Sequence, residues 1–157
     1  MTGAPVAQVR EAPAFRQLLE LLVEYERSLP AQLRHGRDPD VSVVRTAYGE
    51  PNAAFIALID DVAAGCIAVT RLDGRTAIVQ RLYVRPHYRE HGLARALVTA
   101  AVDFCRKRGY ARAVLDTQRD LLPGAYELYA SIGFTVCEPY GTLTYDKATF
   151  MELRLVE

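Results

Sequence analysis

Apolar residues near the start of the chain recur at every third or fourth position. The segment from residue 14 to residue 27 therefore carries one apolar face, which predicts an amphipathic helix. After Pro30, residues 31–40 are expected to form a short helix that runs into a loop. The apolar positions of the first helix are Phe15, Leu18, Leu19, Leu22 and Tyr25.

The pattern changes to apolar, partly β-branched runs in the middle of the chain. Residues 53–60 and 62–71 form two such runs separated at Asp60-Asp61, which predicts a β-hairpin. Asp73-Gly74 is a strong tight-turn signal before a third strand over residues 76–84. We therefore expect an antiparallel meander.

A helical period returns after Pro86 and lasts until Gly109. A short strand over residues 113–117 then completes a β-α-β unit, whose two strands should run parallel. We expect a second helix over 122–132 and final strands over 134–138 and 148–155. The whole chain, residues 1–157, thus reads as one α/β domain with a mixed sheet. The long helix should be buried along Leu93, Leu97, Ala100, Ala101 and Phe104.

Composition excludes several functional classes. The chain has 157 residues, of which 19 are basic and 19 acidic, so no net field attracts nucleic acid or an anionic membrane. No signal peptide or membrane-spanning stretch is recognisable, which favours a cytoplasmic protein. Cys66, Cys105 and Cys137 suit free, unreactive thiols, and no metal site is expected.

The segment from Arg89 to Arg95 lies between a predicted strand and the start of a long helix. The first turn of a helix offers unpaired backbone N–H groups and the positive end of the helix dipole. Gly92 and Ala94 keep the approach to these groups open, and Arg89 adds a charged donor. Such a glycine can be only a turn, but the preceding strand and the following helix together favour an anion site.

Residues 82–97, with the sequence LYVRPHYREHGLARAL, resemble the signature of the GNAT family of N-acetyltransferases. The phosphate loop of that family reads Gln or Arg, two free residues, Gly, one free residue, then Gly or Ala. Arg89, Gly92 and Ala94 fill these positions. The likeness continues through Leu128-Tyr129, Gly133-Phe134 and the last strand, so it covers residues 53–155.

This resemblance implies a mixed, mostly antiparallel sheet with a central splayed parallel pair, flanked by helices. It also implies acetyl-CoA as the cosubstrate, with the pantetheine arm paired to the strand backbone. The backbone groups of Leu82, Tyr83 and Val84 should serve the arm, and Thr117 should add a polar contact. The residues implied for the diphosphate are Arg89, Glu90, His91, Gly92, Leu93, Ala94 and Arg95.

By the same resemblance Tyr129 is the general acid that protonates the leaving thiolate. The alternative is a packing tyrosine with a bonded hydroxyl. Relatives often carry a glutamate as general base in the strand before the phosphate loop, but Ile78 stands at the matching position. A water chain or another residue must then deprotonate the amine, and the weak candidates are Glu50, His87 and His91.

We therefore expect direct acetyl transfer to a primary amine, with a small molecule favoured over a protein. A non-catalytic acetyl-CoA sensor and a binding scaffold are the alternatives, and the oligomeric state, including a homodimer, stays open. The N-terminal helices and the loop over residues 138–147 should wall the acceptor site. Residues there that could favour a cationic amine, or merely form a solvated surface, are Glu24, Tyr25, Glu26, Tyr140, Tyr145 and Asp146.

Overall fold

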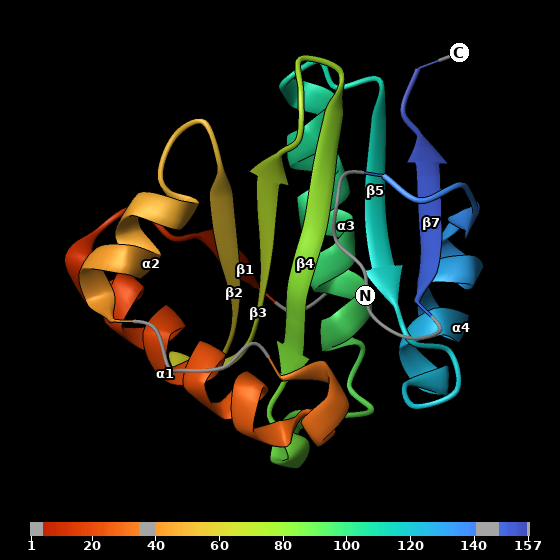
Figure 1. Cartoon of the computed structure of the whole chain (residues 1–157). Helices are drawn as coiled ribbons and strands as arrows, with labels where there is room; N and C mark the ends of the chain where they lie inside the picture. Colours follow the sequence, from red (N-terminus) through yellow and green to blue (C-terminus); the bar gives the residue numbers. More distant parts are fainter. Residues whose placement is uncertain (1–4, 35–39, 141–147, 157) are drawn as a thin grey trace.

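The structure is a computed structural model that describes residues 5–34, 40–140 and 148–156. Seven strands form one sheet in the order β1-β2-β3-β4-β5-β7-β6. Helices α1 and α2 cover one face of this sheet, and α3 and α4 cover the other (Figure 1). Among the described strands, β4 and β5 form the single parallel pair. The predicted fold class is thereby confirmed.

The elements follow the predicted order with two additions. The strands are β1 (Val6–Gln8), β2 (Ala53–Ile59), β3 (Val62–Arg71), β4 (Thr76–Val84), β5 (Arg112–Thr117), β6 (Thr135–Val136) and β7 (Thr149–Arg154). The helices are α1 (Ala12–Ser28), α2 (Val41–Tyr48), α3 (Leu93–Lys107) and α4 (Pro123–Ile132), with 3-10 turns at Ala31–Leu33 and Pro86–Tyr88.

The two additions are α2 and β1, which the sequence did not predict. The short helix expected over residues 31–40 is only a 3-10 turn at Ala31–Leu33, and residues 35–39 lie outside the described part of the chain. Helix α2 is rich in β-branched residues, which lower helix propensity. It forms because Asp40 caps it, accepting a hydrogen bond from the Val43 N–H at 2.9 Å, and because Val44 and Tyr48 are buried.

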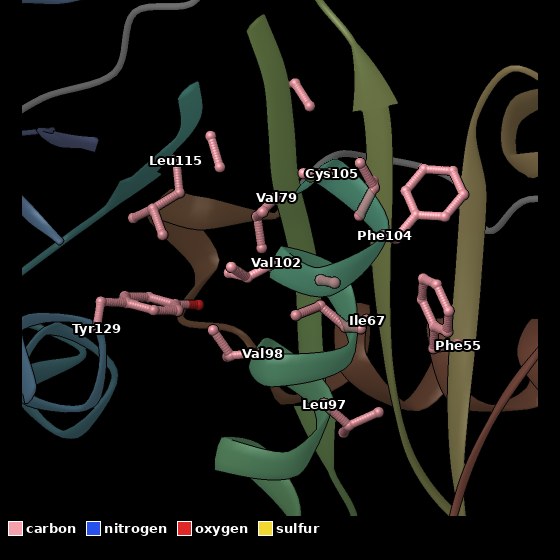
Figure 2. Close-up of a cluster of buried hydrophobic side chains, with 14 of the residues drawn as sticks. Phe55, Ile67, Val79, Leu97, Val98, Val102, Phe104, Cys105, Leu115 and Tyr129 are labelled. Atoms are coloured by element: carbon pink, nitrogen blue, oxygen red, sulfur yellow. The ribbon is translucent and has the colours of Figure 1, made fainter. Parts of the chain in front are cut away.

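The two larger hydrophobic clusters confirm the predicted periodicities. On the α1 face, Phe15, Leu18 and Leu22 are buried, and Leu19 and Tyr25 are partly buried against the same cluster. On the α3 face, the helix packs over Phe55, Ile67 and Val79 of the sheet (Figure 2). The buried stripe of α3 is broader than predicted and Ala100 is only partly buried. Its members are Leu93, Leu97, Val98, Ala101, Val102, Phe104 and Cys105.

The parallel pairing of β4 with β5 is short. It runs from Thr76 opposite Arg112 to Ile78 opposite Val114 and then stops. Beyond this point the strands diverge toward their C-terminal ends (Figure 1). The β5-facing edge of β4 therefore has no strand partner after Ile78 among the described residues. Backbone groups on such an edge need other hydrogen-bond partners.

The outer half of β4 is held from the β3 side by a close backbone contact. A Cβ atom placed on Gly65 of β3 would lie 2.6 Å from the carbonyl oxygen of Tyr83. Only glycine therefore fits at this position without a shift of one strand. Gly65 thus fixes how closely β3 supports the unpaired part of β4.

We expect the Gly65→Ala variant to unfold more easily, with a loss of about 1–3 kcal/mol from the forced separation of two packed strands. Urea unfolding measures this change. Gly124→Ala is the matched control, because a Cβ there meets no atom within 4 Å and the position is helical. It should be neutral or more stable by about 0.4–1 kcal/mol. Equal midpoints for Gly65→Ala and the parent would contradict the close contact.

Candidate active site

The N-terminus of α3 is an open backbone surface. Gly92 is its N-cap residue, with φ 78° and ψ 9°, and no side chain caps this end of the helix. A Cβ at Gly92 would meet nothing within 4 Å. The first-turn N–H groups of a helix lack intrahelical partners and lie at the positive end of its dipole. This end of a 15-residue helix can therefore receive an anion.

The loop before α3 brings the predicted phosphate-loop residues together. Glu90 and Gly92 both adopt left-handed backbone conformations, which turn the chain sharply into the helix. The Arg89 Nε donates to the Val84 carbonyl oxygen at 2.9 Å, so this arginine also braces the end of β4. Leu93 is buried in the core, and only its backbone can serve a ligand. Arg95 is exposed and donates to the Ser131 hydroxyl of α4 at 2.8 Å.

The predicted pantetheine strand lies beside this loop. Leu82 and Val84 pack against the α3 cluster, whereas Tyr83 packs on the α1 side. The Val84 carbonyl is already occupied by Arg89, so the strand edge offers a ligand fewer free groups than the sequence suggested. Thr117, at the end of β5, is buried.

The polar residues that follow Thr117 have other partners. The Gln118 Oε1 accepts the backbone N–H groups of Asp120 and Leu121, at 2.8 and 3.2 Å, and so shapes the turn before α4. The Arg119 guanidinium lies 4.2 Å from the centre of the Tyr126 ring. Both side chains thus organise the loop.

Tyr129 is the buried residue of α4, with 7% of its surface exposed. Its neighbour Leu128 is less buried. The ring packs edge-on against Phe134, with 5.9 Å between centroids. Its hydroxyl points from α4 toward α3 (Figure 2), and its ring belongs to the same cluster as Val98 and Leu115.

The electrostatic surroundings keep Tyr129 protonated. Burial raises the pKa of its phenol strongly, and the nearby Tyr25 and Asp116 raise it further. A neutral phenol in a dry setting can donate a proton to an anion that forms beside it.

Several polar side chains gather on the α1 side of the gap between β4 and β5. The Tyr140 hydroxyl donates to Asp116 Oδ1 at 3.0 Å. Burial raises the pKa of Tyr25, while a hydrogen bond and the positive charge from Arg81 counter this rise. The sequence analysis missed Arg81 and Asp116. The available signal was a charged residue within each of two mostly apolar strands: Arg81 is the one charged residue of β4, and Asp116 lies near the end of β5, which also begins at Arg112.

Glu24, a candidate for the acceptor site, and Glu50, a candidate general base, both form ion pairs with arginines. Arg85 binds both carboxylate oxygens of Glu24, at 2.7–3.1 Å, and lowers the pKa of that carboxyl. Arg85 also donates to the Ala63 carbonyl, and Tyr83 donates to Glu24, so this group ties α1 to the end of β4. Glu50 binds Arg108 at the C-terminal end of α3.

The general-base candidates are not brought to the gap. Glu50 binds Arg108 at the far end of α3, about 24 Å along the helix from Gly92 at 1.5 Å per residue. His87 and His91 are exposed on the loop before α3. Ile78 packs against a small apolar cluster with Val114 on the α1 side. Tyr145 and Asp146, the predicted acceptor-loop residues, lie outside the described part of the chain.

The cysteines have no nucleophilic character. Burial raises the pKa of Cys66 and of Cys105 to about 12, and partial burial also raises the pKa of Cys137. All three are free thiols, and a buried thiol with a high pKa is unreactive. Over the described ranges there is no group of three potential metal-binding side chains and no helix that could cross a membrane.

Comparisons with known proteins agree with this architecture. An acetyltransferase of Streptococcus agalactiae has the same fold with a TM-score of 0.78 at 23% identity, covering 99% of this chain and 100% of its own. A phosphinothricin acetyltransferase of Sinorhizobium meliloti, solved in complex with acetyl-CoA, gives 0.80 at 17% identity, with 99% and 90% coverage.

Similarity in sequence establishes the family. An N-acetyltransferase of Schizosaccharomyces pombe is 34% identical over 145 residues, which cover 90% of this chain and 86% of the relative. The family model for the acetyltransferase (GNAT) family matches residues 15–134. The protein therefore belongs to the GNAT family of acetyltransferases.

Proposed function

We propose that this chain transfers an acetyl group from acetyl-CoA directly to a primary amine. The observation that carries the proposal is a juxtaposition of three features around one gap. These are the uncapped N-terminus of α3, the unpaired edge of β4, and the protonated phenol of Tyr129. Together they provide an anion site, a backbone edge for an amide-bearing arm, and a proton donor.

The diphosphate of the cosubstrate binds at the start of α3. The backbone N–H groups of Leu93, Ala94 and Arg95 serve as donors, and the absence of a side chain at Gly92 leaves room for the phosphates. Arg89, held near Val84, adds positive charge at the rim, beside the exposed His91 and Glu90.

The pantetheine arm follows the open edge of β4. Backbone groups of Leu82 and the N–H of Val84 pair with its amides, as a further strand would, whereas the Tyr83 carbonyl lies against Gly65 on the β3 side. A backbone N–H at this edge also polarises the thioester carbonyl, where negative charge develops during attack. The gap between β4 and β5 is needed for this role, because a full ladder would leave no free groups.

Tyr129 protonates the leaving thiolate. Burial raises the pKa of the phenol, but the same dry surroundings raise the pKa of a thiol, as Cys66 shows with a value of about 12. The pKa values of the phenol and of the leaving thiol therefore shift in the same direction, and proton transfer from the phenol to the thiolate stays feasible. Cys66 and Cys105 are buried, and the pKa of every one of the three free cysteines is raised, so the amine attacks the thioester itself without an acyl-enzyme.

Acetyl-CoA should raise the melting temperature of the chain. At about 100 times its Kd a ligand stabilises the fold by ~2.7 kcal/mol, or roughly 5–11 °C for a domain of this size. Gly92→Asp should abolish the shift, because it places bulk and negative charge against the phosphates. Differential scanning fluorimetry with and without acetyl-CoA measures both.

Gly109→Asp is the matched control for this experiment. Gly109 has φ 80° and equally open surroundings, but it lies at the other end of α3. Both variants bear the same backbone strain, so only the Gly92 variant should lose the acetyl-CoA shift. If both variants kept the full shift, the diphosphate site would be assigned wrongly. If the parent showed no shift, a binding scaffold would be favoured over an enzyme.

The Tyr129→Phe variant should retain acetyl-CoA binding and lose turnover. Removing a general acid lowers kcat by about 10²–10⁴-fold. Release of free thiol from acetyl-CoA across a panel of primary amines measures the effect. Tyr126→Phe, one helical turn earlier, is the control and should keep its activity. A melting shift without thiol release from any amine would instead indicate a non-catalytic acetyl-CoA sensor.

A further inference from the structure

The outer part of β4 turns one set of backbone groups toward β3 and the other set toward the gap. The Arg85 N–H donates to the Ala64 carbonyl oxygen at 2.8 Å, and Val84 pairs with Gly65 in the register. Along an antiparallel pair, successive residues direct their backbone groups alternately toward the partner strand and away from it. The Val84 N–H and the backbone groups of Leu82 therefore face the gap, where no described strand pairs with them.

The position of this edge depends on contacts from elements other than β5, because β5 no longer pairs with β4 at this level. Arg85, the residue after Val84, is bound from two elements. Its Nη1 donates to the Ala63 carbonyl oxygen of β3 at 2.7 Å, and its Nε and Nη2 donate to the Glu24 carboxylate of α1 at 2.7–3.1 Å. The planar guanidinium thus joins α1, β3 and β4 in one orientation.

Tyr83, the residue before Val84, adds a second connection to α1. Its hydroxyl donates to Glu24 Oε1 at 3.2 Å, and its ring is buried in the same cluster as Leu22. Glu24 therefore binds residues on both sides of Val84. Hydrogen bonds from Arg85 lower the pKa of the Glu24 carboxyl, so the carboxylate keeps its charge at neutral pH.

The guanidinium of Arg85 is committed to the protein. All three of its nitrogens donate to protein oxygens, and 24% of the Arg85 side chain and 39% of the Glu24 side chain are exposed. The ion pair of Arg108 with Glu50 has similar geometry, but 36% and 64% of these side chains are exposed. Bidentate pairs that are partly shielded from water hold their geometry better than surface pairs. Arg85 is therefore a support for the strand.

We infer that Glu24 is a positioning residue for acetyl-CoA: through Arg85 and Tyr83 it sets the place of the open β4 edge against the pantetheine arm. The arm pairs with backbone groups of this edge, and a hydrogen bond weakens steeply when donor and acceptor are misaligned. An edge without a partner strand keeps its alignment only if side chains hold it. The inference rests on the proposed binding of acetyl-CoA along β4, and it adds an α1 residue that acts without contacting the cosubstrate.

The test separates the two parts of acetyl-CoA. Adenosine 3′-phosphate 5′-diphosphate, here 3′-phospho-ADP, carries the diphosphate without the pantetheine arm, so it engages the start of α3 and not β4. Glu24→Gln should weaken acetyl-CoA binding about 10-fold, the loss expected when one or two backbone hydrogen bonds to the arm are impaired. The same variant should bind 3′-phospho-ADP as the parent does. Isothermal titration calorimetry measures both ligands, and the thiol-release assay should show a raised KM for acetyl-CoA.

Two further variants complete the design. Arg85→Lys should resemble Glu24→Gln, because an ammonium keeps the charge but lacks the fork that binds Glu24 and the Ala63 carbonyl together. The double variant should bind acetyl-CoA no more weakly than either single variant, since both changes break one contact. Glu50→Gln is the matched control, because it breaks a bidentate pair with Arg108 at the far end of α3 and should leave binding unchanged. Circular dichroism checks that each variant is folded.

The outcomes distinguish this inference from the proposed function. Unchanged acetyl-CoA binding in Glu24→Gln and Arg85→Lys, or an equal loss for 3′-phospho-ADP, would overturn the positioning role and leave acetyl transfer standing. Absence of acetyl-CoA binding by the parent would overturn both. Binding of acetyl-CoA without thiol release would overturn acetyl transfer alone, because the comparison of the two ligands needs no turnover. A loss confined to acetyl-CoA in both variants, with Glu50→Gln unaffected, would support the role of Glu24.

Discussion

The short parallel pairing of β4 with β5 governs the rest of this structure. Three residue pairs join the strands, and then the ladder ends while both strands continue. Ending a ladder inside a sheet leaves backbone groups without strand partners. Such groups cost free energy unless another group hydrogen-bonds to them. The close contact at Gly65 and the six pairs between β5 and β7 hold the two strands from outside. The separation is therefore enforced by neighbours on either side.

The prediction of the diphosphate-binding residues rests on local chemistry along the chain. A glycine before a helix, small residues in its first turn and a preceding strand are all readable along the chain. The structure places Arg89, Gly92 and Ala94 together at the start of α3 as this reasoning predicts. The burial of Tyr129 depends in part on Val98 of α3 and Leu115 of β5, which belong to the same cluster and which no pattern within α4 reveals.

The arrangement on the α1 side of the sheet was less predictable because it is assembled from distant segments. Helix α2 depends on the Asp40 cap and on packing of Val44, which override the poor propensity of its residues. The position of Arg81 depends on a bulge, and a bulge is visible only once the register of two strands is known. The pairing of Glu24 with Arg85 spans 61 residues, a separation that no local pattern reveals.

The ion pair between Glu24 and Arg85 fixes the orientation of α1, the helix to which Glu24 belongs. Successive residues of an α-helix point about 100° apart, so fixing one side chain fixes the direction of the next. With Glu24 bound at two points, α1 cannot roll or slide along the sheet without breaking the pair, and Tyr25 is aimed at Arg81 as a result. Substitutions on the exposed side of α1 would therefore leave the orientation of Tyr25 unchanged. The outer surface of this helix can vary in sequence while its inner tyrosine keeps its position.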